Sequence, residues 1–307
     1  MEIKVITEEY YSQCMNIINL AKKMLKTKSG QWQHGYPNEK LIAFDIKEKR
    51  LFGAFEGNTL LALMALIKEK EPSYLKISNG SWLDYPCDND LIVHRLAVLE
   101  GYHGKKIGQQ MLNFAINYAK KNNLISVKID THENNFAMKK VIDDCGFFYC
   151  GVITILDEPV DNLRNAYEYP LNGRGNKLAS VYDFLKKNRT YYLATSKESQ
   201  PSIRPFGTID LYGGSLYIQT GLVKEVAKEM IANPHIAICC FDSKTWLRIK
   251  ATATLDNRVD VQNHMLKAYP ELSTMYKPMD GNTATFKLSE VDARFCSFTD
   301  PEKHFNF

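Results

Sequence analysis

The sequence predicts two domains: an α+β or α/β domain with a mixed sheet flanked by helices in residues 1–171, and a small β-barrel in residues 177–307. A chain of 307 residues has the length of two typical domains. Strand and helix patterns alternate in the first part, whereas short β-branched or aromatic strands recur about every ten residues in the second. The polar, glycine-containing segment 172–176 is the expected linker.

The first domain is expected to open with a short strand and an amphipathic helix. Thr7 can cap this helix, and apolar residues from Tyr10 to Ala21 recur at helical spacing. Gly146 can end a later helix. The expected helices are 7–28, 107–123 and 134–146, and the expected strands are 51–58, 59–69, 90–98, 124–132, 147–156 and 164–171.

The second domain is expected to consist mainly of short strands. Turn residues separate these strands, as in a small barrel. The expected helices are 178–188, 224–233 and 260–270, and the expected strands are 190–196, 201–212, 215–221, 235–242, 246–256 and 284–298.

Composition and charge exclude several classes of function. The apolar share of 45%, the charged share of 24% and the net charge of +4 are ordinary for a globular protein and give no basis for nucleic-acid binding. No run reaches ~18 apolar residues, so we expect no membrane span. The N-terminus lacks the apolar core of a signal peptide, and the 7 cysteines include no CxxC pair. These features predict a cytoplasmic protein without disulfides and without a metal site.

A basic turn between the expected strand 90–98 and the expected helix 107–123 is the first candidate binding site. The unpaired amides and the dipole at the start of a helix favour an anion. Gly104 and Gly108 leave room for close approach, while Lys105 and Lys106 add positive charge. The residues alone leave two alternatives open: a pyrophosphate cradle, or an ordinary basic turn before a surface helix.

The stretch AVLEGYHGKKIGQQML (97–112) resembles motif A of the GNAT-family acetyltransferases, Arg/Gln-x-x-Gly-x-Gly/Ala. The strand–helix series through residue 171 also matches that family's core in order and spacing. His103 stands where Arg or Gln is usual, and Lys106 stands where Gly is usual. The resemblance implies a GNAT fold that binds acetyl-CoA. The implied CoA contacts are Leu96, Ala97, Val98, His103, Gly104, Lys105, Lys106, Ile107, Gly108, Gln109 and Asn135.

His94 is the candidate general base for acetyl transfer, because imidazole titrates near neutral pH and its strand would lie beside the reacting carbon. A buried structural histidine is the alternative. Backbone N–H groups near Leu96 can hold the oxyanion. The resemblance implies a tyrosine as proton donor on the last helix, but Ile142 stands at that position. The candidates for the acceptor pocket, unless they form only a packed loop, are Trp32, His34 and Tyr36.

A second candidate site lies at the start of the expected helix 224–233. The Thr220 hydroxyl, the Lys224 ammonium and the helix N-terminus can converge on one phosphate, although hairpins with basic rims are the alternative. Trp246 and Arg248 alternate along a strand, so we expect both side chains on one face.

These parts occur in the order of an Arg-Pro strand, a Thr-x-x-x-Lys segment and a Trp-x-Arg strand. The order resembles the FMN-binding split barrels of the pyridoxamine 5′-phosphate oxidase-like family over residues 177–300. The resemblance implies a split β-barrel that binds FMN and forms a homodimer. The implied FMN contacts are Arg204, Pro205, Phe206, Gly207, Thr208, Gln219, Thr220, Lys224, Trp246 and Arg248.

Together these features predict a CoA-dependent N-acetyltransferase for a small-molecule amine, fused to an FMN-binding oxidoreductase-like domain. Three alternatives stay open. The barrel can serve only for dimerisation or sensing. The protein can instead be a flavoprotein reductase or oxidase whose first domain is inactive or only binds CoA. A pure interaction protein is the third class.

Overall fold

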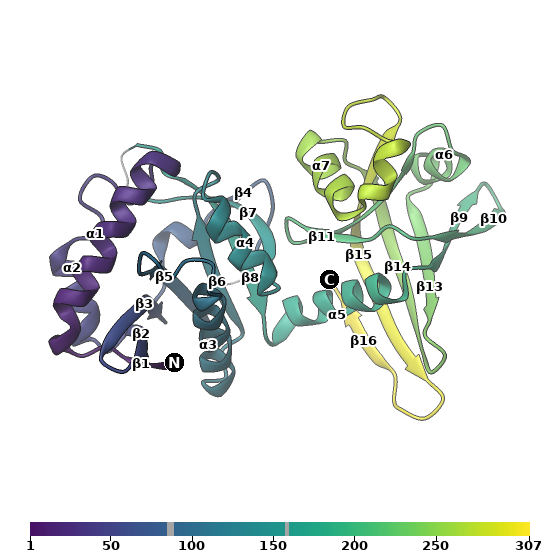
Figure 1. Cartoon of the computed structure of the whole chain (residues 1–307). Coiled ribbons are helices and arrows are strands. Elements are labelled where there is room, and N and C mark those ends of the chain that lie inside the picture. The colour runs from purple at the N-terminus through teal and green to yellow at the C-terminus, as the bar shows by residue number, and fades with distance from the viewer. Residues whose placement is uncertain (85–88, 157–159) are drawn as a thin grey trace. The chain divides into compact units, whose positions relative to one another are not determined.

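The computed structural model describes residues 1–84, 89–156 and 160–307, which form two compact units, Met1–Gly173 and Arg174–Phe307 (Figure 1). The boundary between the units lies inside the expected linker 172–176. Most of that segment is helical rather than irregular, because α5 already begins at Gly173.

The strands and helices expected in the first unit all appear, in the predicted order. Its sheet has the order β1-β2-β3-β5-β6-β8-β7-β4, and β5 and β6 are its parallel neighbours. Its elements are β1 (Glu2–Val5), η1 (Glu8–Tyr10), α1 (Tyr11–Lys28), α2 (Glu39–Lys47), β2 (Leu51–Glu56), β3 (Thr59–Ile67), η2 (Pro72–Tyr74), β4 (Ile77–Ser78), β5 (Asp90–Val98), α3 (Ile107–Lys121), β6 (Ser126–Thr131), α4 (Phe136–Asp144), β7 (Phe148–Thr154) and β8 (Leu163–Pro170).

The helices cover both faces of this sheet (Figure 1). On one face, the buried side chains of α3 and α4 pack with inward-facing residues of the strands, for example Met111 and Ile142 against Val93 and Ile129. Helices α1 and α2 lie on the other side (Figure 1). Helix α2 was not among the expected elements.

The second unit is built on an antiparallel sheet with the order β10-β9-β13-β14-β15-β12-β11, and β16 pairs with β15. The expected strand 201–212 is divided into β10 and β11. The elements are α5 (Gly173–Asn188), β9 (Tyr191–Lys197), β10 (Gln200–Phe206), β11 (Asp210–Tyr212), β12 (Ser215–Gly221), α6 (Glu225–Ala232), β13 (His235–Phe241), β14 (Thr245–Leu255), α7 (Val259–Ala268), η3 (Pro270–Thr274), β15 (Thr283–Ser297) and β16 (Lys303–Asn306).

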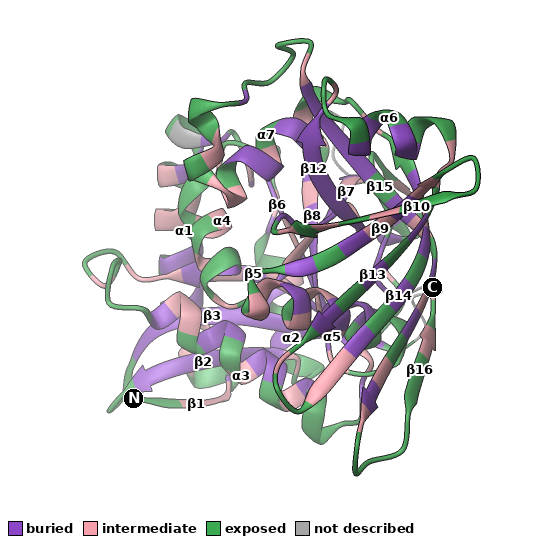
Figure 2. Ribbon diagram, turned by 90° about the vertical axis from the view of Figure 1, so that its right-hand side faces the viewer, coloured by how far each residue is buried: buried purple, intermediate pink, exposed green. Residues whose placement is uncertain are grey.

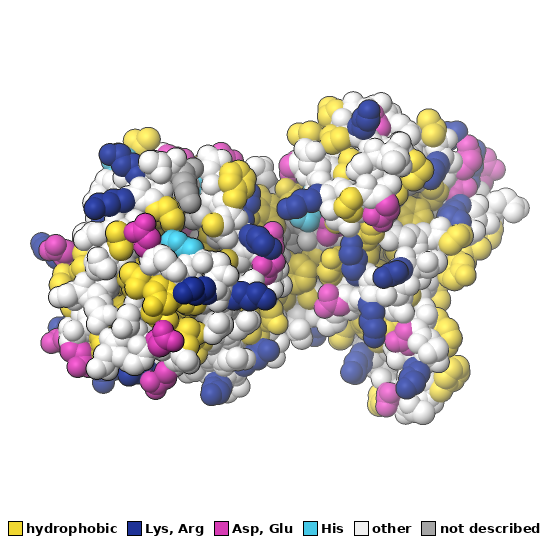
Figure 3. All heavy atoms as spheres, in the orientation of Figure 1, with side chains coloured by type: hydrophobic (Ala, Val, Ile, Leu, Met, Phe, Trp, Pro, Cys, Tyr) yellow, Lys and Arg dark blue, Asp and Glu magenta, His cyan; other side chains and the backbone are white. Residues whose placement is uncertain are grey.

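Buried and exposed residues alternate strictly along β13, and the first half of β14 follows the same alternation (Figure 2). One face of these strands therefore belongs to the core, and the other faces outward. Helix α6 packs against β9, β12 and β14. Lys and Arg side chains on the visible surface of this unit are interspersed with acidic and apolar ones (Figure 3).

Within the described residues, no helix has the length and apolar character needed to cross a membrane. The cysteines in this part of the chain, all free thiols, are Cys14, Cys145, Cys150, Cys239, Cys240 and Cys296. Cys87 lies outside the described residues.

Candidate functional site

Strand β5 contains a β-bulge where it separates from β6. The parallel pairing of the two strands reaches its last register pair at Val93 and Ile129. Just beyond this pair, Arg95 and Leu96 both lie opposite Met64 of β3, and Arg95 adopts a φ of 57°. A bulge takes backbone groups out of the regular ladder and redirects side chains. The split between β5 and β6 therefore begins beside backbone groups that regular strand pairing does not use.

Arg95, which sequence analysis did not single out, anchors this bulge. Its buried guanidinium lies with Nε 2.8 Å from Asp45 Oδ2, and Nη1 donates a hydrogen bond of 2.9 Å to the Tyr36 hydroxyl. Asp45 is wholly buried in α2 and also accepts a 2.6 Å bond from Arg50 Nε. The single negative charge of this buried carboxylate offsets part of the positive charge of the two guanidiniums. The bulge is thus tied to α2 and to the expected acceptor loop through Tyr36.

His94 precedes the bulge and contacts the segment that follows β3. Its Nε2 lies 3.8 Å from Glu71 Oε2, and its ring meets the Tyr74 ring edge-on at 5.9 Å. Burial, and secondarily Arg95 and Arg50, lower the pKa of His94 to about 3. The expectation of a histidine that titrates near neutral pH was therefore wrong. The imidazole is neutral at pH 7, so its approach to Glu71 is not an ion pair.

Tyr74 brings a second carboxylate to the same split. Its hydroxyl donates a 2.7 Å hydrogen bond to Asp130 Oδ1, one residue beyond the last β5–β6 pair. The Trp82 ring stacks on Tyr74 at 5.3 Å, and its indole N–H donates a 2.9 Å bond to the Tyr74 carbonyl. Burial, followed by the charge of Asp130, raises the pKa of Tyr74 well above its usual value. The contacts hold the phenol in its neutral, donating form.

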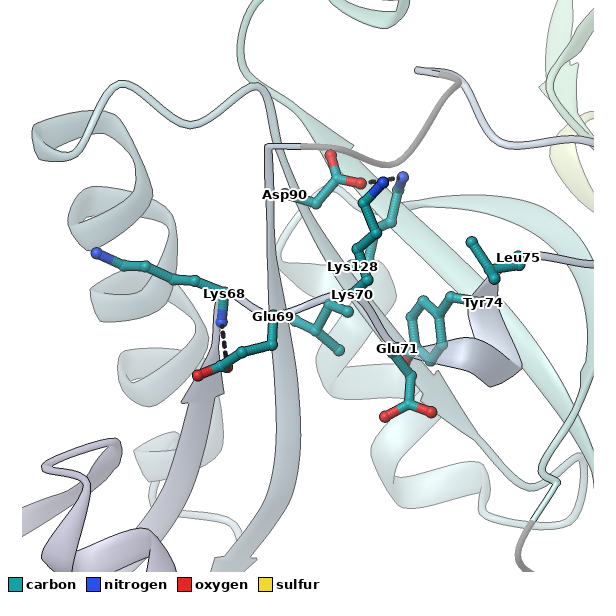
Figure 4. Close-up of a pocket in the computed structure, with 9 residues that line it drawn as sticks. Lys68, Glu69, Lys70, Glu71, Tyr74, Leu75, Asp90 and Lys128 are labelled. Atoms are coloured by element: carbon teal, nitrogen blue, oxygen red, sulfur yellow. Dashed lines mark hydrogen bonds and ion pairs between the residues drawn. The ribbon is translucent and has the colours of Figure 1, made fainter.

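A buried ion cluster lies behind this aromatic pair. Lys128 has no exposed surface; its Nζ is 2.5 Å from Asp90 Oδ2 and 3.8 Å from Glu168 Oε1. The ammonium also lies 4.7 Å from the centroid of the Trp82 ring. Burial raises the pKa of Glu168 to about 7. Figure 4 shows Lys128 reaching Asp90 near Tyr74, around a cavity of ≈ 10 Å³. This volume holds about one water. Glu168 Oε2 also accepts a 2.7 Å hydrogen bond from the Leu83 backbone N–H, so the cluster anchors the segment that carries Trp82.

The residues expected to line the acceptor pocket differ in how far they are buried. Trp32 is buried and Tyr36 reaches the bulge, whereas His34 is exposed. Asn135 caps α4 through its side-chain oxygen and donates a 3.2 Å bond to Gln31 Oε1. The loop around Trp32 is therefore fixed to Asn135, the residue before α4 that was expected to contact CoA.

The basic turn after β5 has one open side. Gly104 has a φ of 79°, and nothing lies within 4 Å of the position that a Cβ would take. His103 Nε2 lies 3.1 Å from the Val98 carbonyl oxygen and so braces the turn. Lys106, the N-cap residue of α3, has φ 60° and ψ 16°. Glycine adopts this left-handed conformation without strain, which explains why glycine is usual at this position of motif A.

Gly108 lies in the first turn of α3, beside α4. A Cβ at this position would lie 3.4 Å from Val141 Cγ1 of α4, which is an ordinary van der Waals contact. At Gly104, nothing lies within 4 Å of the Cβ position, so the room for an anion is larger there. Ile142 is fully buried between α3, α4 and the sheet, so its position supplies no proton donor.

In the second unit, the expected FMN residues lie on two faces of one sheet. Arg204 lies opposite Leu193, a fully buried residue on the core face. Trp246 and Arg248 lie opposite the exposed Phe241 and Cys239, and the Arg248 guanidinium is 6.0 Å from the Trp246 ring. The same-side prediction for this pair was correct, but Arg204 is on the other face.

In the phosphate-binding part of the expected FMN site, the arginine already has a carboxylate partner. The Arg204 guanidinium is bound by Glu229 of α6 at 2.6 Å. Thr220 is buried in β12, and Lys224 is exposed just before α6. Gln219 is buried, and neither atom of its amide has a hydrogen-bond partner among the described residues.

The remaining expected contacts lie at the end of β10 and in the segment that leads to β11. Thr208 is buried, and its hydroxyl bonds both the backbone N–H and the carbonyl of Gln219. This segment is therefore held in the core by hydrogen bonds between a side chain and the backbone. The other expected residues are Pro205 and Phe206 at the end of β10 and Gly207 directly after it.

The outer face of this sheet has a hollow of ≈ 540 Å³ between Ala194, Ala237 and Lys250. Arg248 lies two residues before Lys250 on the same face. The Trp246 indole N–H is buried and has no hydrogen-bond partner among the described residues. Trp246 and Arg248 therefore share the outer face with this hollow, but neither of them lines it.

Comparison with known proteins identifies both units. Residues 16–147 match the model of the acetyltransferase (GNAT) family, and residues 179–296 match that of pyridoxamine 5′-phosphate oxidase. No curated protein matches the chain. A GNAT-family acetyltransferase from Streptococcus agalactiae shares 29% identity over 56% of this chain and 96% of its own, with a TM-score of 0.50. A NimC/NimA family protein from Clostridium acetobutylicum shares 33% identity over 43% of this chain and 93% of its own, with a TM-score of 0.42. The chain therefore joins a GNAT-family domain to a pyridoxamine 5′-phosphate oxidase-like domain.

Proposed function

We propose that the first domain transfers the acetyl group of acetyl-CoA to the amine of a small molecule. The observation that carries this proposal is the bulge at Arg95, where β5 and β6 separate beside His94 and Glu71. The same strand leads directly into the open turn at Gly104. One strand thus presents a place for the thioester and, at its end, a place for the pyrophosphate.

Binding of acetyl-CoA would use mainly backbone groups. The backbone of Leu96, Ala97 and Val98 would accompany the pantetheine arm past the bulge. The amides from Gly104 to Gln109 would face the pyrophosphate at the start of α3, where the helix dipole favours an anion.

In the transfer, the nitrogen of the neutral amine attacks the thioester carbon; a C–N bond forms and the C–S bond breaks. Backbone N–H groups at the bulge would hold the oxygen as it gains negative charge. Because the pKa of His94 is about 3, its neutral imidazole would accept a hydrogen bond from the amine but would not take up the amine proton. Glu71, 3.8 Å away, is the group that can take the proton and pass it to water. With Ile142 at the usual tyrosine position, CoA leaves as a thiolate, whose ordinary pKa is ~8.5.

The test is release of free CoA thiol from acetyl-CoA in the presence of a panel of primary amines. Glu71→Gln should lower kcat by about 100-fold, within the range of general base catalysis. Glu69→Gln is the matched control, because Glu69 is 71% exposed and should leave kcat unchanged. Equal rates for the two variants would exclude Glu71 as the base, and no amine-dependent release from the wild type would exclude the function.

For the second domain, we propose a homodimer in which flavin binds between the subunits. Arg204 and Trp246 face opposite sides of the sheet, so one chain cannot bring both to a single flavin.

Free cysteines in the described part support a reducing, cytoplasmic location.

An FMN-dependent oxidoreductase is the second candidate function, with the first domain inactive or only binding CoA. The unpartnered Trp246 indole N–H beside Arg248 favours it, because a flavin ring carries acceptor atoms. A visible spectrum after addition of FMN or riboflavin, combined with acetyl-CoA calorimetry, separates the candidates. Flavin binding without acetyl-CoA binding would support the oxidoreductase alone.

A further inference from the structure

The arginine that was expected to hold the flavin phosphate already forms an ion pair with a carboxylate of its own domain. Glu229 Oε2 lies 2.6 Å from Arg204 Nη2 and also accepts a hydrogen bond from the Thr195 hydroxyl. Glu229 Oε1 accepts a 3.2 Å bond from the Ser202 hydroxyl. Arg204 Nη1 donates to the Thr195 oxygen at 2.5 Å and to the Leu193 carbonyl at 3.5 Å.

The local structure directs this carboxylate to the arginine. Ser202 and Thr195 lie opposite each other on β10 and β9, and Ser202 is two residues before Arg204 on the same face. The Ser202 hydroxyl donates to Glu229 without touching the guanidinium, whereas the Thr195 hydroxyl donates to Glu229 and accepts from Arg204. The side chains of Arg204 and Glu229 are 23% and 10% exposed, so water screens this pair less than an exposed one. The hydrogen bonds from Thr195 and then Arg204 lower the pKa of Glu229, which keeps it ionised near neutral pH.

A phosphate and a carboxylate compete for the same kind of partner, a guanidinium that donates parallel N–H bonds. While Glu229 holds Arg204, a phosphate brought to that guanidinium meets a neutralised charge and a neighbouring anion. We propose that Glu229 is a specificity-determining residue that occupies Arg204 in place of the flavin phosphate, so that the domain binds FMN no more tightly than a flavin without phosphate. This inference rests on the proposed flavin binding of the second domain.

The test compares FMN with riboflavin, which lacks the phosphate, by quenching of flavin fluorescence on the full-length protein. The wild type should bind the two with Kd values within about threefold. Glu229→Gln removes the charge but keeps an oxygen for Arg204 and Thr195 and an amide that can donate to the Ser202 hydroxyl. It should tighten FMN by about tenfold or more and leave riboflavin unchanged.

Glu225→Gln is the matched control, because Glu225 lies on the same helix, pairs with Lys228 at 2.7 Å and has a 68% exposed side chain. It removes the same charge and should change neither affinity. The double variant Arg204→Gln/Glu229→Gln should lose the gain for FMN, because the gain requires the guanidinium.

Several outcomes would overturn the inference. One is a wild type that binds FMN much more tightly than riboflavin, a comparison that needs no variant to fold. Another is a folded Glu229→Gln protein without a gain for FMN, or with an equal gain for riboflavin. Riboflavin binding in those cases would leave the proposed flavin function standing, whereas failure of every protein to bind either flavin would remove both.

Discussion

Lys106→Gly should stabilise the first domain, although it removes a side chain and inserts a glycine at the start of a helix. Lys106 has φ 60° and ψ 16°. A left-handed residue with a Cβ costs about 1–2 kcal/mol, and glycine removes this cost. The added backbone freedom of glycine in the unfolded chain offsets about 0.5–1 kcal/mol of the gain. The expected net change is a stabilisation of about 0.5–1 kcal/mol.

Differential scanning calorimetry of the full chain measures this change. A gain of ~1 kcal/mol raises Tm by about 2–4 °C for a domain of this size. Lys105→Gly removes the same charge from a neighbour that is not among the positive-φ residues. It also removes an ammonium 4.2 Å from the Tyr102 ring, so it should lower Tm. If Lys106→Gly lowers Tm as much as Lys105→Gly does, the strain argument is wrong.

Two further predictions concern buried charges of the first domain. Lys128→Met should lower the free energy of unfolding, measured by urea denaturation, by about 3–5 kcal/mol, because Asp90 and Glu168 lose their buried cation. The control Lys140→Met changes an exposed lysine and should alter the free energy of unfolding by no more than ~0.5 kcal/mol. Equal effects of the two variants would show that the buried cluster does not anchor the fold. In the folded protein the pKa of His94 is lowered from 6.5 to about 3, so the unfolded chain binds a proton at this residue more readily. The free energy of unfolding should therefore fall as the pH drops from 6.5 towards 3, by up to ~1.4 kcal/mol per pH unit for this group. His94→Gln should flatten that part of the pH profile, and an unchanged slope would show that the imidazole is not held neutral.

The sequence predicted the elements that create the site, because their signals are local. The strand 90–98, the turn with Gly104 and the helix beginning near Ile107 all appear where apolar periodicity and glycine spacing placed them. The bulge was not predictable, since it depends on how β5 pairs with β3 across the sheet. Arg95 in an apolar strand was the available signal, but its partner Asp45 lies on a helix that was not expected.

The functional state of several residues also depends on tertiary structure. His94 has a sequence context that fits a base, yet burial and neighbouring guanidiniums hold it neutral. Alternation along one strand correctly predicted that Trp246 and Arg248 share a face. Alternation within a strand does not predict whether side chains on two different strands face the same side of the sheet. The opposite orientation of Arg204 and its ion pair with Glu229 therefore became known only from the strand register and the position of α6.

Calorimetric titration of acetyl-CoA into two Gly104 variants tests the central claim most directly. Asn and Asp both tolerate the left-handed φ of 79° and have nearly the same shape, so the pair isolates one negative charge in the open side of the turn. Gly104→Asn should retain acetyl-CoA binding, and Gly104→Asp should weaken it by about tenfold or more relative to Gly104→Asn. Equal affinities for the two variants, or no binding by the wild type, would contradict acetyl-CoA binding at this turn.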